Sequence, residues 1–382
     1  MAEVSQETVL KEIEEQAQVT SQRRLIWLRF RRHRLAFVGM FILLCFYSVA
    51  IFSEFIATQH PQVDLAESAY IPPQMIQPFD GMKFKPFVYS IRTQRNPETF
   101  KMEHFPIKEE KNYIDFFVRD SKHTYKFLGL FKTDLHLMAA YDALGNPARF
   151  HPWGTDRYGR DFWSRVTYGT RLSMSIGLIG VALSLFLGIL LGGISGLRGG
   201  VMDLLIQRLI EFLKAMPTIP LWLALSAAIP VHWSNVQVYF TITIILSILG
   251  WTDLAREVRG RFLAMREEDF VLAARAYGTK ELNIIFRHMV PSFVSHIIAI
   301  ATLSVPAMII AETALSFLNL GLRPPSISWG VLLYEAQNIY SVASAPWLLL
   351  PGILIIIVVL SFNFMGDGLR DAADPYSNST GS

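Results

Sequence analysis

Long apolar runs separated by polar links dominate the chain. Six runs approach the length of about 20 residues that an α-helix needs to cross the hydrocarbon core of a bilayer. They cover residues 35–57, 172–197, 204–229, 238–254, 292–318 and 347–365. This pattern predicts an all-α polytopic membrane protein with six transmembrane helices.

The first run follows a group of arginines and has no convincing cleavage site. The group consists of Arg23, Arg24, Arg29, Arg31, Arg32 and Arg34. A secretory signal would be shorter and would end at small residues, whereas this run continues through Phe52 and Phe55. Because basic flanks stay in the cytoplasm, we expect residues 1–34 to be a cytoplasmic segment and residues 35–57 an uncleaved membrane helix.

The stretch between the first two runs has a different character. It mixes prolines, charges and aromatics, and its alternating segments 83–89 and 125–128 are typical of short strands. Residues 116–119 and 124–131 could form a hairpin around a turn at 120–123. We expect residues 58–166 to form a small extracytoplasmic β or α+β domain inserted between helices 1 and 2.

Composition supports the membrane assignment and excludes some chemistry. The chain is 52% hydrophobic and 13% aromatic, with a mean hydropathy of +0.32, which is too apolar for an ordinary soluble protein. Its one cysteine, Cys45, excludes a disulfide framework and a cysteine-based metal site within one chain. Gly-Lys occurs nowhere, so the chain has no nucleotide-binding P-loop.

The basic residues are distributed unevenly among the links. With the N-terminus inside, six spans place the links after residues 197 and 256 in the cytoplasm. The link after 256 carries Arg256, Arg259, Arg261, Arg266, Arg275, Lys280 and Arg287. The link around His232 carries no lysine or arginine, and the link 319–346 carries only Arg323. This distribution follows the positive-inside rule.

A polar, helix-forming segment at residues 267–291 stands between two of the apolar runs. Its acidic start favours a helix N-terminus, and Gly278 suits the end of a first short helix over 268–277. A second helix is expected after Thr279, limited by Pro291. Two short helices joined at a glycine predict a compact knob.

This segment carries the first resemblance to a known family. Ala273-Ala274, three residues, Gly278, nine residues, His288-Met-Val290-Pro291 resembles the cytoplasmic loop signature of ATP-binding-cassette (ABC) importer permeases. Their pattern is Glu-Ala-Ala, three residues, Gly, nine residues, Ile, one residue, Leu-Pro. Leu272, His288 and Val290 depart from it, but the peptide and nickel branch often lacks the Glu.

In that family the loop is a coupling helix seated in a cleft of a separate ATPase subunit. The resemblance implies a coupling loop over 257–291, and small alanines would let the ATPase approach closely. The coupling residues it implies are Glu268, Ala273, Ala274, Gly278 and Pro291. A surface hairpin without a partner is the alternative.

Two further segments are similar to the same branch. Residues 151–171, with Gly-Thr-Asp, Gly-Arg-Asp and Ser-Arg, look like the approach to the second helix of dipeptide and oligopeptide permeases. They could form a capped turn that packs the inserted domain onto the membrane part, or they could contact substrate. The ending 366–375, Gly-Asp-Gly-Leu-Arg-Asp-Ala-Ala-Asp-Pro, is very similar to the family's ending.

Ionisable residues in apolar runs are costly and are paired or functional. Arg208, Glu211 and Lys214 are spaced three apart, which predicts a local ion network or a lining for the inner mouth of a pathway. Glu312, about 20 residues into the fifth run, is expected near the outer end as a structural anchor or a gate residue. The polar stretch 326–338 predicts a short helix at the outer surface.

The resemblance covers the first helix and residues 151–375, and it implies the type I ABC importer permease fold. Residues 167–371 would form the five-helix permease domain and 372–382 a cytoplasmic tail. The chain would be the second, C-type permease subunit of a peptide importer in the bacterial inner membrane, multi-pass, with both termini in the cytoplasm. Oligosaccharides and nickel chelates are alternative cargoes.

The resemblance also implies partners. These are a second homologous permease, two ABC ATPase subunits, an extracytoplasmic solute-binding protein and membrane lipid, with no nucleic acid. ATP and magnesium would bind in the ATPase partners, so we expect no catalytic residue, cofactor or metal site in this chain.

Two other classes of protein stay open on the residues alone. An ion-coupled secondary transporter would also carry several spans with buried charges, but it would not need the coupling loop and often shows internal repeats. An enzyme embedded in the membrane would need a nucleophile and base or a metal cluster, and no His-Glu-x-x-His spacing occurs. Binding of an ATPase subunit, or transport under an ion gradient, distinguishes these classes.

Overall fold

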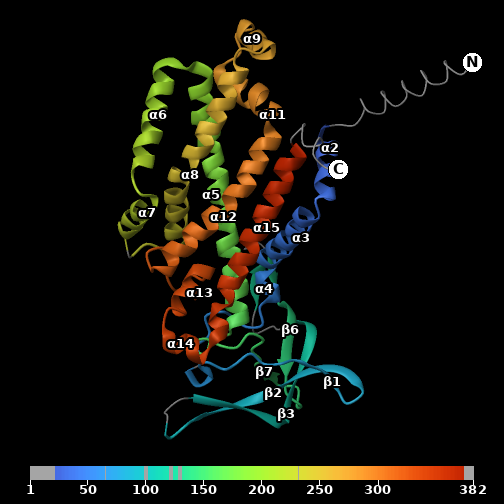
Figure 1. Ribbon diagram of the computed structural model, residues 1–382. Coiled ribbons are helices and arrows are strands. Elements are labelled where there is room, and N and C mark those ends of the chain that lie inside the picture. Colours follow the sequence, from blue (N-terminus) through green and yellow to red (C-terminus); the bar gives the residue numbers. More distant parts are fainter. Residues whose placement is uncertain are drawn as a thin grey trace, which may run out of the picture.

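The structure, a computed structural model, describes residues 22–64, 66–98, 102–119, 124–127, 131–230 and 232–373. Helices form an elongated bundle, with the short helix α9 (Asp269–Ala276) at one end and a β-sheet at the other. These are called here the α9 end and the sheet end (Figure 1). The mostly helical membrane fold is confirmed.

Three helices open the described part of the chain: α2 (Gln22–Arg32), α3 (Arg34–Ile51) and α4 (Ser53–Ile56). The His33 ring begins α3, since its Nδ1 accepts a hydrogen bond from Ala36 N at 3.2 Å. The predicted first span thus corresponds to α3 and α4. Of the predicted cytoplasmic segment 1–34, residues 1–21 lie outside the described part of the chain.

Antiparallel strands form a five-stranded sheet in the order β1-β2-β3-β6-β7. The strands are β1 (Gln77–Asp80), β2 (Lys83–Arg95), β3 (Met102–Arg119), β6 (Leu135–Tyr141) and β7 (Pro147–Ala148), preceded by the 3-10 turn η1 (Ala66–Ser68). In the register, Phe87 opposes Tyr113, which in turn opposes Tyr141. One face is covered by its own small core of Val88, Ile114, Ala140 and Phe150.

The predicted hairpin between 116–119 and 124–131 is wrong. β3 pairs instead with β6, where Val118 opposes His136. β4 (Tyr125–Phe127) pairs with β5 (Phe131–Thr133) in a separate two-stranded ribbon. Alternation of apolar and polar residues indicates a strand but does not select the strand that pairs with it. β6 has seven residues and can pair with more of the end of β3 than the three-residue β4 can. The expected turn at 120–123 lies outside the described residues.

The bundle is built around α5 (Phe162–Arg198) and α8 (Asn235–Met265), with α12 (Val294–Phe317) and α15 (Leu350–Ala373) beside them. Glycines let α5 approach α8 closely, as small residues do between membrane helices. A Cβ added at Gly188 would lie 2.7 Å from Leu254, and one at Gly196 would lie 2.7 Å from Phe262.

The predicted third span is not one straight helix. It is divided into α6 (Gly200–Ala215) and α7 (Thr218–Ala227), which are bent by 85°. Pro217 cannot donate a backbone hydrogen bond, and it confines Met216 to extended backbone with ψ 136°. Five helices in the described chain are long and apolar enough to span a membrane, or six if the bent pair forms one span.

The segment after α9 differs from the predicted second helix. It consists of α10 (Glu281–Asn283), the π-helical turn η2 (Ile284–Met289) and α11 (Val290–Ser292). Pro291 does not end the helical run, because it occupies the first turn of α11, where its missing N–H is not needed.

The short helix predicted within 326–338 is α13 (Trp329–Glu335), and it is packed among other helices. Trp329, Val331, Leu332 and Glu335 are buried, since α13 packs against α5, α12 and α15. It is followed by α14 (Ile339–Ser344) and the 3-10 turn η3 (Pro346–Leu349), which leads into α15.

Candidate coupling surface and buried charge centres

The α9 end carries a knob made of α9, α10, η2 and α11. Its bend is a glycine-capped helix end: Gly278 N donates to Arg275 O at 2.9 Å, and Thr279 N donates to Ala274 O at 3.1 Å. Gly278 has φ +72°, which is accessible to glycine and strained for most other residues. The predicted role of Gly278 as the turn between two short helices is confirmed.

One face of α9 packs on the bundle. Val271 is fully buried and Ala274 is 8% exposed, both against a cluster that includes Phe262, Ile285 and Met289. The expectation that both alanines are open to another surface is therefore wrong for Ala274. Which face of a helix is buried depends on the elements that pack against it. Two adjacent small residues in the sequence do not indicate that face.

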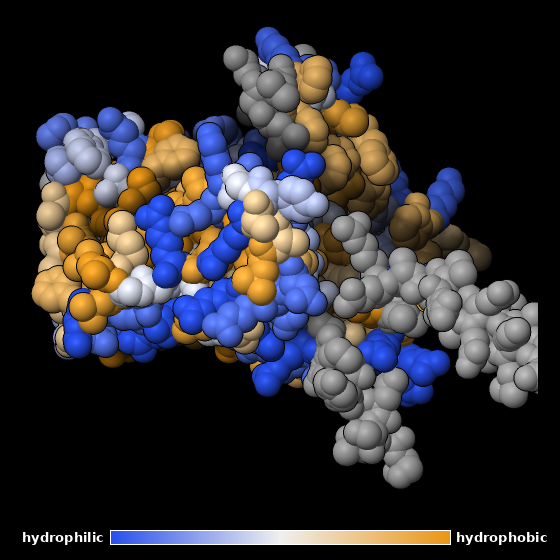
Figure 2. All heavy atoms as spheres, turned by 90° about the horizontal axis from the view of Figure 1, so that it is seen from above, coloured by the Kyte–Doolittle hydropathy of each residue, from blue (hydrophilic) through white to orange (hydrophobic). Residues whose placement is uncertain are grey.

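The other face of the knob is open and carries several large apolar side chains. Its exposed apolar side chains are Phe270, Leu272, Tyr277, Leu282 and Phe286, with the small Ala273 among them and the exposed Lys280 and Arg287 nearby in the chain. Figure 2 looks onto the α9 end and shows apolar and hydrophilic side chains interleaved across it. Glu268 precedes α9, and its carboxylate makes no capping bond to the helix. We call this face the coupling surface.

Polar contacts fix the knob to the ends of the long helices. Arg275 Nη2 donates to the carbonyl of Leu197 at 2.8 Å, and Arg198 Nε lies 2.5 Å from Glu281 Oε2. The coupling surface is thereby attached to the C-terminal end of α5. Of the coupling residues, Ala273 and Gly278 are exposed in the knob, Ala274 faces inward, and Pro291 lies where the knob joins α12.

Glu312 occupies a buried polar centre toward the sheet end of α12. Its carboxylate is inaccessible to solvent and accepts hydrogen bonds from Ser316 Oγ at 2.8 Å, Ser328 Oγ at 2.9 Å and Ser173 Oγ at 3.5 Å. No ion pair with a basic side chain is found for it in the described chain. The three serines come from α12, the start of α13 and α5, so one carboxylate joins three elements.

Each serine of this centre is itself held by a backbone amide. Leu322 N donates to Ser316 Oγ at 3.0 Å, Trp329 N to Ser173 Oγ at 3.1 Å, and Val331 N to Ser328 Oγ at 3.2 Å. The hydroxyl groups are therefore oriented with their protons toward Glu312. This geometry favours anchoring of the α12–α13 link, and a contribution to gating stays a prediction.

The three charges expected together on the third span are not one network. Arg208 Nη1 lies 2.6 Å from Glu211 Oε2 on α6, and both side chains are exposed. Lys214 contacts Asp253 on α8 instead. The structure does not bring Arg208 and Glu211 to Glu312, because they lie on a different helix with their side chains on the surface.

A second buried charge centre was missed by the sequence reasoning. Asp156, Arg160, Arg165 and Glu335 meet where the segment before α5 packs on α13. Arg160 Nη2 and Arg165 Nη2 lie 2.9 and 3.0 Å from Glu335 Oε1, and Arg165 also contacts Asp156. The available signal was Glu335 at the end of the apolar segment 329–334, together with Arg165 near the start of α5.

The segment before α5 forms the predicted capped turn. Asp161 caps α5 by accepting from Ser164 N at 2.8 Å, and His151 Nδ1 lies 3.1 Å from its other oxygen. Thr58 N and Gln59 N donate to Ser164 Oγ at 3.1 Å. This arrangement favours the packing interpretation of the segment over direct substrate contact.

The long apolar helices and the knob define a class, that of multi-pass membrane proteins with a surface element held at one end of the bundle. Sequence comparison adds that residues 188–377 match the family described as the inner membrane component of binding-protein-dependent transport systems. Residues 21–73 match the N-terminal transmembrane domain of oligopeptide transport permease C. The chain belongs to this family of binding-protein-dependent transport permeases and is a multi-pass inner membrane protein.

Similar proteins carry transport names. The dipeptide transport system permease protein DppC of Alkalihalophilus pseudofirmus is 40% identical over 233 residues, which are 61% of this chain and 74% of the relative. The oligopeptide transport system permease protein OppC of Bacillus subtilis is 37% identical over 60% of this chain and 73% of its own. A chain of the methionine ABC transporter MetNI overlaps weakly in structure, with a TM-score of 0.42 and 16% identity over 54% of this chain and 95% of its own.

Within the described residues, no group of three or more His, Cys, Asp or Glu side chains is placed to hold a metal ion.

Proposed function

We propose that this chain is the C-type permease subunit of an ATP-driven importer of peptides, forming half of a translocation pathway. The observation that carries the proposal is the coupling surface. It is a glycine-capped knob that exposes several large apolar side chains, and exposed apolar side chains gathered on one element are typical of a protein interface. The names of the similar proteins DppC and OppC support peptides as the cargo.

The proposal assigns a partner to each end of the molecule. At the α9 end, the coupling surface seats in a separate ATPase subunit, which binds ATP and magnesium. At the sheet end, the chain meets an extracytoplasmic solute-binding protein. A second homologous permease completes the pathway, and two ATPase subunits complete the transporter. This chain contributes no catalytic residue and no cofactor or metal site.

The topology follows from this assignment. The bent pair α6 and α7 counts as one span, which gives the six helices of the type I importer permease fold with both termini in the cytoplasm. The basic residues around the knob support this orientation. Residues 58–166, which include the sheet, are placed outside the membrane, and Glu312 falls near the outer end of its span.

The test is transport by the assembled complex in proteoliposomes. The chain is co-purified with its companion permease, ATPase subunits and binding protein, and uptake of short peptides is measured with ATP inside the vesicles. We expect uptake that needs ATP and the binding protein. ATP-driven uptake of an oligosaccharide or a nickel chelate, with none of peptides, would reassign the cargo, and uptake driven by an ion gradient alone would overturn the proposal.

A further inference from the structure

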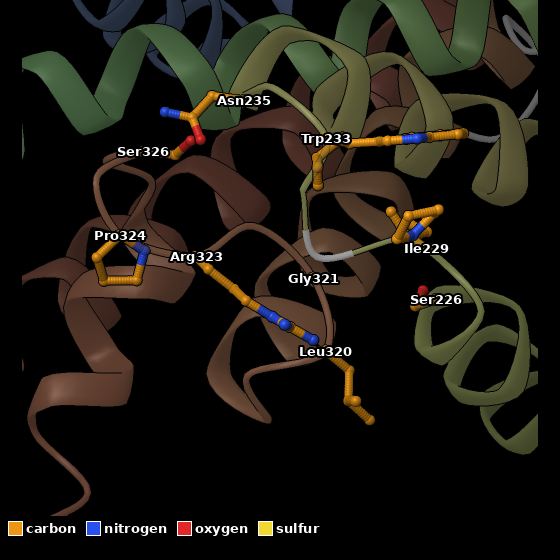
Figure 3. A pocket seen from close by; sticks show the side chains of 11 residues that line it. Ser226, Ile229, Trp233, Asn235, Leu320, Gly321, Arg323, Pro324 and Ser326 are labelled. Carbon is orange, nitrogen blue, oxygen red and sulfur yellow. The ribbon is translucent and has the colours of Figure 1, made fainter.

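A small pocket opens at the sheet end of the bundle, between two links. One link joins α7 to α8 and the other joins α12 to α13 (Figure 3). The pocket has a volume of about 150 Å³. Its lining comprises Ser226, Ile229, Pro230, Trp233, Asn235, Val238, Leu320, Gly321, Arg323, Pro324 and Ser326.

Arg323 is the charged side chain of this lining. It extends from the α12–α13 link into the space between the two segments (Figure 3), and its Nε donates to the carbonyl of Asn319 at 3.1 Å. Arg323 forms no ion pair with an acidic side chain of the described chain. Neither residues 219–238 nor residues 313–334 contain an Asp or Glu. The pocket therefore holds a positive charge that its own walls do not neutralise.

A second polar group in the lining is also unsatisfied. Ser226 is 1% exposed, and its hydroxyl finds no hydrogen-bond partner in the described part of the chain. Buried hydroxyl groups in proteins are nearly always hydrogen-bonded, so the unpaired Ser226 hydroxyl leaves a donor beside the pocket for a bound group. The Asn235 amide and the Ser326 hydroxyl add further donors to the same lining.

We propose that this pocket binds the carboxylate of a ligand, with Arg323 as its ionic partner and Ser226 as a hydrogen-bond donor. A guanidinium group pairs with a carboxylate through two parallel hydrogen bonds, which few other groups accept as well. This inference rests on the proposed function, under which the carboxylate is the C-terminal group of a peptide during import.

The size and lining favour a peptide end over a protein partner. The volume is below the range of about 300–1,000 Å³ that encloses a whole small-molecule ligand, so the pocket fits a terminus. Ile229, Trp233 and Leu320 supply an apolar wall for the side chain next to that carboxylate. A binding protein would need a broad, complementary surface, whereas this site is a recess.

The test measures the reactivity of Arg323 in the purified complex without the binding protein. Phenylglyoxal modifies accessible guanidinium groups, and mass spectrometry follows its rate at Arg323 and at Arg92, an exposed arginine on β2. Tri-alanine should slow the labelling of Arg323 severalfold and leave Arg92 unchanged. Tri-alanine amide, which lacks the carboxylate, should not slow it. Equal protection by both peptides, or by neither, would overturn the proposal.

Matched variants separate binding from a structural role. Arg323→Gln should abolish retention of labelled tri-alanine by the complex, and Arg323→Lys should weaken it by about tenfold, because lysine keeps the charge without the planar fork. Arg92→Gln should bind as the wild type does. If Arg323 only stabilises the Asn319 turn, both Arg323 variants lose thermal stability while retention per folded complex stays unchanged.

The outcomes distinguish this inference from the proposed function. ATP-dependent uptake of tri-alanine without protection of Arg323 would refute the carboxylate pocket and leave the importer assignment intact. Protection of Arg323 by tri-alanine in a complex that imports a different solute would refute the peptide cargo and retain the pocket. Protection by ligand-free binding protein alone would assign the pocket to a protein partner and overturn the proposal.

Discussion

Single residues hold the sheet end of the bundle together, and Glu312 shows how. Its carboxylate receives three serine hydroxyl groups from α5, α12 and the start of α13. Each of those hydroxyl oxygens also accepts a hydrogen bond from a backbone N–H in a link or at the start of a helix. Removing the Glu312 carboxylate therefore affects the contacts of three elements. Substitution of the exposed Glu211 would break one ion pair within one helix.

Glu312→Gln tests this anchoring role against a role in gating. Gln keeps the size but replaces one acceptor oxygen by an NH₂ donor, so at least one serine loses its acceptor. We expect a loss of about 1–3 kcal/mol, the usual cost of an unsatisfied buried polar group, seen as a lower Tm of the purified complex. Basal ATPase activity per folded complex should stay unchanged.

Glu211→Gln is the control, with an expected change below about 0.5 kcal/mol because its ion pair is exposed. A Glu312→Gln complex with normal Tm and altered basal ATPase activity would instead identify Glu312 as a gate residue.

At the scale of elements, the knob depends on one backbone conformation. A Cβ at Gly278 would meet nothing within 4 Å, so a substitution there is limited by φ +72° and not by crowding inside this chain. The cost is about 1–2 kcal/mol for a residue with a Cβ, and higher for a β-branched one. The added side chain would also project from the exposed bend of the coupling surface.

Gly278→Val should uncouple ATP hydrolysis from transport. The strained bend would reorient α9 against α10, and the branched side chain would block close contact with the ATPase. We expect an assembled complex in which the binding protein no longer stimulates ATP hydrolysis and uptake falls at least tenfold. Gly278→Asn is the matched control, because asparagine tolerates positive φ and should retain most activity. Wild-type coupling in the Val variant would refute the coupling role of the knob.

The elements also show what a sequence can and cannot reveal. Apolar runs of bilayer length predicted α3, α5, α8, α12 and α15, because spanning the hydrocarbon is a requirement on local composition. Pairings across the chain were not predictable: Lys214 contacts Asp253, and Arg165 contacts Glu335, 170 residues away. The sequence motif around Ala273 and Gly278 identified the bend. The inward orientation of Ala274 depends on the buried cluster, which includes Phe262, on which α9 packs.

On the scale of the whole molecule, the sheet is attached through the segments that flank it and through α4, which contacts β6 and brings Phe55 against Phe117 of β3. Ile71 N donates to Thr155 Oγ1 at 2.8 Å, and His151 N donates to Gln74 Oε1 at 2.6 Å. Residues 58–74 therefore pack with the segment before α5, and the strands begin only at Gln77. Gln74 and His151, which flank the sheet, lie side by side, since Gln74 N donates to His151 O at 3.1 Å, so the stretch between them can be bypassed.

Replacing residues 77–148 with a short Gly-Ser linker should leave the helices folded. The sheet has its own core of Val88, Ile114, Ala140 and Phe150, which shares no residue with the helix cores. We expect a Tm within a few degrees of the wild type and a loss of productive interaction with the binding protein. Collapse of the helical part, measured by aggregation on size-exclusion chromatography, would show that the sheet is required for folding.

The side on which the sheet lies can be measured in the intact chain. Met82 is fully exposed at the β1–β2 turn, so Met82→Cys in a Cys45→Ser background offers one reactive thiol. A membrane-impermeant maleimide should label it from outside, in spheroplasts where the outer membrane is open. Labelling only after the inner membrane is permeabilised would reverse the proposed topology.

The length of α5 has a mechanical consequence. Its 37 residues extend about 55 Å, well beyond the roughly 30 Å of a hydrocarbon core. One end is capped by Asp161 beside the sheet, and the other holds the knob through Arg198 and the Leu197 carbonyl. α5 is thus a single continuous helix that, under the proposed topology, extends beyond both faces of the membrane. Pivoting it by 10° about its midpoint would move its two ends by about 5 Å in opposite directions. A small displacement of the knob would therefore be transmitted along one continuous helix to the end beside the sheet.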